Sequence, residues 1–307
     1  MKDKRIAAID VGSNTIRMLV GNCTGVNYFP ELYRQQITRL AGGFQPGQGL
    51  ASASMERTLA VFSEYAEILQ QMGVDQVRAV GTAALRRAEN AQHLINLIKL
   101  KTRLDLEIIN GEEEARLSSA GVLSALQPIP DSSMIVDIGG GSTEVIFCHQ
   151  QKVLFSCSYP LGVVQLCEEM PDEEHRLEYL KAMVVKFASD LLRAKVSAEL
   201  LETCQLVGTA GTVTSLAALD LEMREYDRNR INNHRLEFEW LENVLDTLSG
   251  ISVAEREQLP GFEPGRGDVI IPGLQLLIAL GRYFKQSSIL VADSGLLEGI
   301  LLDFCQN

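Results

Sequence analysis

Short, nearly continuous apolar runs alternate along this sequence with longer stretches in which apolar residues recur at helical spacing. The runs at 6–11 and 134–138 each contain one acidic residue near the end and otherwise resemble strands buried on both faces. From Ser54 to Met72 apolar residues recur every three or four positions, and Gly73 follows as a helix stop signal. Strands that alternate with helices predict an α/β fold with parallel or mixed sheets covered by helices.

The rest of the chain continues this alternation. We expect further strands at 26–40, 77–80, 106–109, 153–158, 205–207 and 288–291. We expect helices at 89–103, 112–126, 174–201, 237–248, 253–258 and 269–284, and a last one from Gly295. A glycine-rich mobile loop is predicted at 42–49, and an arginine-bearing loop at 224–235.

One pattern occurs twice in the chain: an apolar run, an acid, an aliphatic residue, a glycine, a polar turn and a second apolar run. It spans Ile6–Val20 and recurs at Met134–Phe147. Two copies of one strand–turn–strand unit predict two related halves that face a common cleft. The matching residues are Asp10 and Asp137, Gly12 and Gly139, and Thr15 and Thr143.

The segment Pro128–Ser133 is the best candidate for a domain boundary, because it combines two prolines with polar residues. We therefore expect an N-terminal domain at 1–127 and a C-terminal domain at 128–307. Each domain would then contain one copy of the repeated unit, and the last helix would pack back on the first domain.

The glycine turns have the composition of phosphate-binding sites. Glycines permit positive φ and leave backbone N–H groups bare, and such N–H groups form concavities that bind phosphate oxygens. A plain hairpin would need only about two such residues. In the second copy, two acids flank the turn where Mg²⁺ could join protein and phosphate. The proposed phosphate-binding residues are Gly12, Ser13, Asn14, Thr15, Gly139, Gly140, Gly141, Ser142 and Thr143, with Asp10, Asp137 and Glu144 as metal ligands.

Three further segments follow predicted strands at the edge where α/β sheets bind ligands. Arg86 could hold phosphate with its planar guanidinium while Arg87 faces solvent; a surface role for both arginines is the alternative. Glu112–Glu114 opens a helix, and one carboxylate there could act as a general base toward water; stabilisation of the helix dipole is the alternative reading. The third segment offers Gly208, Thr209, Gly211 and Thr212 to a further phosphate or a ribose, although simple helix-start packing explains it almost as well.

Composition narrows the class of protein. The chain has 307 residues and a net charge of −12, which argues against nucleic-acid binding. No apolar run reaches the ~18 residues of a membrane span, and the first residues lack the shape of a signal peptide, so we expect a cytoplasmic protein. The six cysteines show no C-x-x-C spacing and are predicted to be free thiols.

Five motifs occur in order along the chain: Asp10-x-Gly12-Ser13-Asn14-Thr15-x-Arg17, Thr82-x-x-x-Arg86-x-x-x-Asn90, Gly111-x-Glu113-Glu114-Ala115-Arg116, Asp137-x-Gly139-Gly140-Gly141-Ser142-Thr143-Glu144 and Gly208-Thr209-x-Gly211-Thr212. Together they resemble the exopolyphosphatase and guanosine pentaphosphate phosphatase family, within the actin-like ATPase and sugar-kinase superfamily. The resemblance covers nearly the whole chain and ends at Gly295–Gly299.

The resemblance implies two ribonuclease-H-like lobes with mixed sheets around an interdomain cleft. It also implies hydrolysis of a terminal phosphoanhydride of polyphosphate or of the stringent-response nucleotide guanosine pentaphosphate, with Mg²⁺ or Mn²⁺ as cofactor. Glu114 would be the general base, with Glu113 as the fallback, and Arg86 would hold the phosphates. A homodimer is a further expectation. The alternatives are a non-catalytic sensor of polyphosphate or guanosine tetraphosphate, and an ATP-dependent kinase of the same superfamily.

The sequence departs from the family pattern in three places. Ala210 replaces a common glycine, and Leu297 replaces the arginine of the closing Gly-Leu-Arg-Glu-Gly element. The chain also stops after the two predicted lobes, whereas longer members continue into helical domains that help form a polyphosphate channel. We therefore expect a distributive enzyme that prefers short polyphosphates or a nucleotide-borne phosphate.

Overall fold

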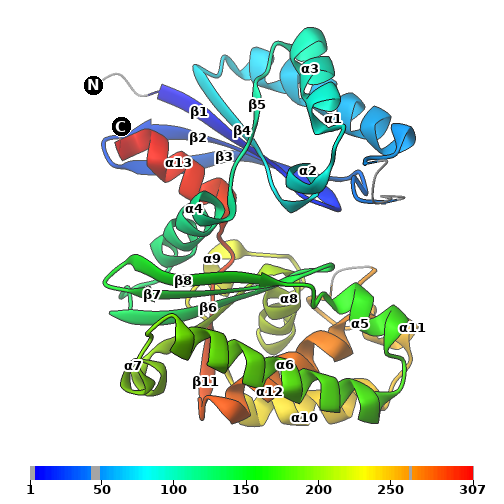
Figure 1. Ribbon diagram of the computed structural model, residues 1–307, viewed down its shortest axis with the longest axis vertical. Coiled ribbons are helices and arrows are strands. Elements are labelled where there is room, and N and C mark those ends of the chain that lie inside the picture. Colours follow the sequence, from blue (N-terminus) through cyan, green and yellow to red (C-terminus); the bar gives the residue numbers. More distant parts are fainter. Residues whose placement is uncertain (1–3, 43–48, 263–264, 307) are drawn as a thin grey trace. The chain divides into compact units, whose positions relative to one another are not determined.

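A computed structural model describes residues 4–42, 49–262 and 265–306, and the chain forms two compact units (Figure 1). The first unit comprises Met1–Gly121 and Gly295–Asn307, and the second comprises Val122–Ser294. The domains expected at 1–127 and 128–307 stay a prediction, because backbone compactness is no test of independent folding. Most of the loop expected at 42–49 lies outside the described residues.

The first unit is built on a five-stranded mixed sheet in the order β3-β2-β1-β4-β5. The first three strands form an antiparallel meander, while β4 and β5 run parallel to β1. This is the strand order of a ribonuclease-H-like sheet. The strands are β1 (Lys4–Val11), β2 (Thr15–Thr24), β3 (Asn27–Ile37), β4 (Gln76–Gly81) and β5 (Leu106–Ile108).

Helices cover both faces of this sheet (Figure 1). On one face α1 and α3 pack against β1 and β2 through residues such as Phe62, Tyr65 and Leu94. On the other face α4 and α13 contribute Leu117, Ile300 and Leu301 to a second cluster. The helices are α1 (Ser52–Met72), α2 (Ala83–Arg87), α3 (Ala91–Thr102), α4 (Gly111–Ser124) and α13 (Leu296–Gln306).

The second unit repeats this topology. Its sheet has the order β10-β11-β9-β6-β7-β8, in which β6, β7 and β8 form the meander and β9 and β11 run parallel to β6. The short antiparallel strand β10 extends the edge. The strands are β6 (Ser132–Ile138), β7 (Thr143–His149), β8 (Lys152–Tyr159), β9 (Gln205–Thr209), β10 (Arg235–Glu237) and β11 (Ser288–Val291).

The second unit's core fills the space between its sheet and helices α6, α8, α10 and α12. The helix expected at 174–201 is wrong, because the structure divides it into α6 and α7. Lys195 adopts a left-handed φ of 66° between them, and the Ser197 side chain caps α7. The helices are α5 (Val163–Glu169), α6 (Glu173–Arg193), α7 (Ala198–Thr203), α8 (Ala210–Asp220), α9 (Arg228–Ile231), α10 (Phe238–Ser249), α11 (Val253–Arg256) and α12 (Ile270–Tyr283).

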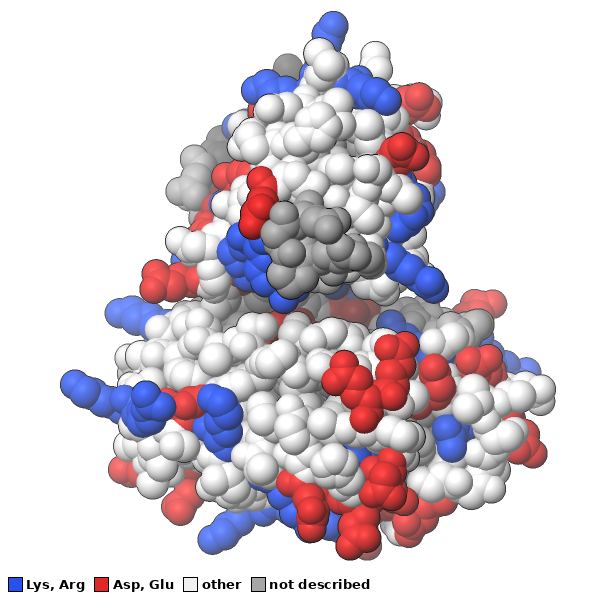
Figure 2. Space-filling model, turned by 45° about the vertical axis from the view of Figure 1, so that its right-hand side comes forward, with Lys and Arg blue, Asp and Glu red and all other residues white. Residues whose placement is uncertain are grey.

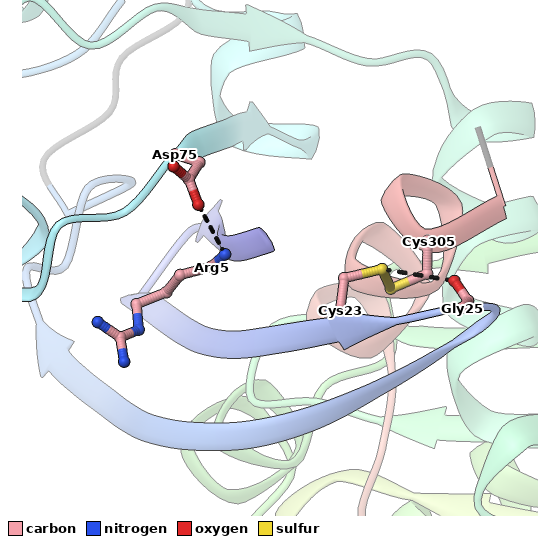
Figure 3. The surroundings of a disulfide bond; sticks show 5 residues. All are labelled: Arg5, Cys23, Gly25, Asp75 and Cys305. Carbon is pink, nitrogen blue, oxygen red and sulfur yellow. Dashed lines mark hydrogen bonds between the residues drawn. A yellow bond between two sulfur atoms is a disulfide. The ribbon is translucent and has the colours of Figure 1, made fainter. Parts of the chain in front are cut away.

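The prediction that all six cysteines are free thiols is wrong, because a disulfide joins Cys23 to Cys305 (Figure 3). Their Cα atoms are 5.6 Å apart, although 282 positions separate them in the sequence. The two cysteines can pair because α13 packs against the sheet that contains β2. The other four cysteines are free, and Cys148 and Cys204 are buried.

No helix within the described ranges is long and apolar enough to span a membrane.

Candidate functional site

In each unit a turn connects the two strands of the first hairpin, β1 to β2 in the first unit and β6 to β7 in the second, and the two turns are built alike. The N–H of Gly12 donates to the carbonyl of Thr15 at 3.0 Å, and the N–H of Gly139 donates to the carbonyl of Ser142 at 2.9 Å. The turns are therefore related as the repeated sequence predicts. Their closure matches Thr15 with Ser142, however, which corrects the expected match with Thr143 by one residue.

In each turn the carbonyl groups face a neighbouring segment of the same unit. Ser13 and Asn14 carbonyls accept hydrogen bonds from the N–H groups of residues 38, 39 and 41. The Gly139 and Gly140 carbonyls accept from Val163 and Val164, both at 3.0 Å. The carbonyls of each turn are therefore engaged in hydrogen bonds within its own unit. The backbone N–H groups of the turns stay the predicted phosphate ligands.

The reason expected for the glycines of the second turn is wrong. Gly139, Gly140 and Gly141 have no positive φ. The glycine that the packing requires is Gly162, at the start of α5. A Cβ on Gly162 would lie 2.1 Å from the Gly140 oxygen and 2.3 Å from the Gly141 Cα. The main chain at Gly162 therefore packs directly against the main chain of the turn.

Several hydroxyl groups of the turns bond to the protein itself. Thr143 is fully buried and donates its hydroxyl proton to the Leu161 carbonyl at 2.5 Å. Thr209 likewise donates to the Ser294 carbonyl at 3.1 Å. These two side chains therefore have no hydroxyl proton left for a phosphate in this structure, and their predicted role is confined to the main chain.

The acids proposed as metal ligands in the second unit lie side by side. Asp137 and Glu144 are directly paired across β6 and β7, so their side chains share one face. The Glu144 Oε1 accepts from the Ser142 and Ser158 hydroxyls at 2.7 and 2.5 Å. Two carboxylates beside a glycine turn are a donor set of the kind that Mg²⁺ takes together with substrate oxygens.

Asp10 is the third predicted ligand, and it belongs to the first unit. Its Oδ2 accepts from Arg17 at 3.0 Å from Nε and 2.5 Å from Nη2. Its Oδ1 is buried without a hydrogen-bond partner among the described residues. A buried carboxylate oxygen left without a donor fits a direct or water-mediated metal contact. Within the described ranges no three His, Cys, Asp or Glu side chains gather as a complete metal site.

Arg86 and Glu114 meet at the carboxyl edge of the first sheet. Arg86 Nη1 donates to Glu114 Oε2 at 2.6 Å and to the Ile109 carbonyl at 3.0 Å. Both side chains are about a quarter exposed, at 28% and 25%. Thr82, which precedes α2, donates its N–H to the Val11 carbonyl, so this pair is adjacent to the strand that leads into the first turn.

Glu113 has a different environment from Glu114. Arg116 grips it with Nε and Nη2 at 2.8 and 2.9 Å, and Arg78 contacts it at 3.1 Å. The hydrogen bonds from Arg116, and then those from Arg78, lower the pKa of Glu113 from 4.5 to about 2. A carboxylate held by two guanidinium groups is a poor proton acceptor, so the geometry favours Glu114 over Glu113 as the base.

The third turn, between β9 and α8, lies next to the second one. Thr209 pairs with Asp137 in the parallel ladder. Ala210 has a φ of 65°, which explains why a glycine is common there. Arg266 is not among the residues expected from the sequence, and its guanidinium lies so close to Gly211 that a Cβ on Gly211 would meet Arg266 Nη1 at 1.6 Å. An arginine between two glycines, at 265–267, was the available signal.

The arginine-bearing stretch 224–235 contains α9 and β10 and is not a simple loop. Arg228 donates to the Asp293 carbonyl and the Ser294 hydroxyl, and Arg235 donates to the Ser288 hydroxyl at 2.7 Å. The hydrogen bonds of these two arginines therefore go to other groups of the protein.

Figure 2 shows basic and acidic side chains interspersed on one face, with acidic ones gathered at the lower right. With a net charge of −12, an anionic ligand must rely on local groups such as Arg86.

Two units with ribonuclease-H-like sheets, each with a glycine-containing turn after its first strand, define a protein of the actin-like ATPase fold. Residues 30–307 match the Ppx/GppA phosphatase family, and the chain belongs to that family. The family expected from the sequence and the expected α/β fold with two mixed sheets are confirmed. The interdomain cleft stays a prediction.

Three comparisons illustrate this relationship. Exopolyphosphatase 2 of Mycobacterium tuberculosis is 31% identical over 315 residues, which cover 97% of this chain and 98% of that protein. The guanosine-5'-triphosphate,3'-diphosphate pyrophosphatase of Aeromonas salmonicida is 29% identical over 98% of this chain but only 59% of its own length. The crystal structure of the Aquifex aeolicus Ppx/GppA family member has a TM-score of 0.84 at 29% identity, covering 98% of this chain and 97% of that one.

Proposed function

We propose that this protein hydrolyses the terminal phosphoanhydride of inorganic polyphosphate, of guanosine pentaphosphate, or of both. The observation that carries the proposal is the Arg86–Glu114 pair, 2.6 Å apart, at the edge of the first sheet. One member can bind phosphate and the other can accept a proton from water. The names of the Mycobacterium and Aeromonas relatives support these two substrate classes.

The chemistry assigns one role to each group. Water attacks the terminal phosphorus, Glu114 accepts its proton, and the bridging P–O bond breaks to release inorganic phosphate and a chain shorter by one phosphate. Arg86 and the N–H groups of the glycine turns hold the phosphate oxygens and offset their charge. Positioning of this kind is most of what phosphoryl transfer requires from a protein.

A divalent cation, Mg²⁺ or Mn²⁺, belongs to the proposal. In the second unit Asp137 and Glu144 would hold it. In the first unit the orphaned Oδ1 of Asp10 is a further candidate ligand, directly or through water. When bound, such a cation neutralises phosphate charge and polarises the phosphoryl group.

The test is release of phosphate by the purified protein from long-chain polyphosphate, guanosine pentaphosphate and ATP, with Mg²⁺ and with excess chelator. We expect Glu114→Gln to lower turnover by about 10²–10⁴-fold, the usual contribution of a positioned general base. Glu112→Gln is the matched control, because Glu112 is an exposed acid two positions earlier in the same helix turn.

Each outcome has a defined meaning. Turnover by Glu114→Gln at the wild-type rate would refute the assignment of the base. Full activity in excess chelator would refute the metal. Tight binding of polyphosphate without release of phosphate would identify a sensor, and transfer from ATP to an acceptor would identify a kinase.

A further inference from the structure

Helix α4, whose first turn contains the proposed base Glu114, is held by a cluster of five charged residues from four elements. Two arginines and three acids alternate in it: Arg78 of β4, Glu107 of β5, Glu113 and Arg116 of α4, and Asp303 of α13. Only the base-bearing helix contributes two members. The cluster is therefore organised around the first turns of α4.

Asp303 joins the two arginines of the cluster. Its Oδ2 accepts from Arg78 Nη1 at 3.2 Å, and its Oδ1 accepts from Arg116 Nη2 at 3.0 Å. Glu113 bridges the same two arginines from the opposite side. Arg78, which also contacts Glu107, therefore binds three carboxylates and Arg116 binds two, an arrangement that restrains the side chains of the cluster together.

Asp303 is itself fixed in place. It lies two residues before Cys305, which is bonded to Cys23 of β2. Ile300 and Leu301, on the same helix, are fully buried against the sheet. The backbone that carries the Asp303 carboxylate is therefore held in place, and the carboxylate can orient Arg116 and Arg78.

We propose that Asp303 is a positioning residue for Glu114, acting through Arg116, Arg78 and Glu113. The contacts run from α13 to the first turn of α4, where Glu113 precedes Glu114 directly. The Glu113 N–H also donates to Asn110 Oδ1 at 2.9 Å, so this turn is held at its backbone as well. The inference rests on the proposed function, because it gives Glu114 the role of the base.

The test compares Asp303→Asn in the wild-type and Glu114→Gln backgrounds, with saturating Mg²⁺ and with polyphosphate varied from below KM to saturation. In the wild-type background we expect kcat to fall about tenfold, with KM changed by less than about twofold, since misplacement of a reacting group by 1 Å can cost up to about 10²-fold. In the Glu114→Gln background we expect no further loss, because the residual rate no longer depends on a positioned base.

The same comparison excludes a purely structural role. If Asp303→Asn only reduced the amount of folded enzyme, it would lower the residual rate of Glu114→Gln by the same factor. Asp105→Asn is the matched control, since Asp105 makes an exposed ion pair with Lys99 outside the cluster, and it should leave kcat unchanged.

If Asp303→Asn does not fold, Arg116→Lys replaces it, because lysine keeps the charge but loses the two-pronged contact with Glu113. An unchanged kcat in the folded variant, or an equal loss in both backgrounds, overturns the inference. A wild-type rate for Glu114→Gln alone would instead overturn the proposed function, so the two failures are distinguishable.

Discussion

Arg86 Nη1 lies 2.6 Å from Glu114 Oε2, although 28 positions separate the two residues in the sequence. The same nitrogen also donates to the Ile109 carbonyl at 3.0 Å. A single guanidinium group therefore orders both the carboxylate proposed as the base and the end of the strand before it. The remaining N–H groups of its fork are available to a phosphate.

This relationship predicts the effect of a substitution that keeps the charge. Arg86→Lys should lower kcat/KM by about tenfold or more, because an ammonium cannot reproduce the planar fork that binds a carboxylate and a phosphate together. Phosphate release measures the change. Arg87→Lys, at the neighbouring exposed arginine, should stay near the wild-type value. Equal losses in the two variants would contradict the assignment.

The contact between Gly162 and the second turn predicts a sharp steric effect. Gly162→Ala should displace Gly140 and Gly141, because its Cβ would overlap their backbone atoms and has no flexible side chain to push aside. We expect kcat/KM to fall by about 10²-fold, since the phosphate would meet a shifted turn. Gly250→Ala is the control, because its Cβ would make only ordinary contacts at 3.5 Å. Unchanged activity of Gly162→Ala would show that the turn does not bind substrate.

The positive φ of Ala210 predicts a stabilising substitution. A non-glycine residue in the left-handed region costs roughly 1–2 kcal/mol, while glycine costs about 0.5–1 kcal/mol in conformational entropy. Ala210→Gly should therefore raise stability by about 0.5 kcal/mol and Tm by about 1–2 °C in calorimetry. Ala279→Gly, within the right-handed helix α12, should lower Tm instead. A lower Tm for Ala210→Gly would refute this account.

The low pKa of Glu113 predicts a loss of stability in acid. A group whose folded pKa is depressed stabilises the protein at pH values above its unfolded pKa, and that contribution is lost as pH falls from 4.5 to about 2. The difference in urea midpoint between wild type and Glu113→Gln, followed by circular dichroism, should therefore shrink over this range. Glu112→Gln, at an exposed acid outside the ion cluster, is the control variant. A difference for Glu113→Gln that is independent of pH would contradict the ion cluster.

The Cys23–Cys305 disulfide predicts the number of reactive thiols. The unfolded protein without reductant should show four thiols, and after reduction all six cysteines should react. Cys305→Ser should destabilise the first unit by about 2–4 kcal/mol, because the lost cross-link no longer restricts the unfolded chain. Cys157→Ser, at a free thiol in β8, is the control. Six reactive thiols before reduction would show that the bond does not form.

The alternation of strands and helices and the repeated turn could both be predicted from the sequence. Both are local: a buried run such as 134–138 and the helical spacing of 54–72 can be recognised within one window, because period and punctuation are properties of neighbouring residues. The helix stop at Gly73 was also readable, and the structure gives it a left-handed φ of 64°. The break between α6 and α7 near Lys195 could not be predicted, because no glycine or proline marks it in the sequence.

Which polar groups form hydrogen bonds or ion pairs with one another follows only from the folded structure. Glu113 and Glu114 are adjacent and chemically identical in the sequence, and only their contacts with Arg116 and Arg86 distinguish them. The sequence predicts Thr143 as a phosphate ligand, but in the structure its hydroxyl donates a hydrogen bond to the Leu161 carbonyl. Asp303 and Cys305 gained their roles only when α13 packed on the first sheet. Hydrogen bonds and ion pairs depend on distances that folding sets between residues far apart in the chain, and no local pattern records those distances.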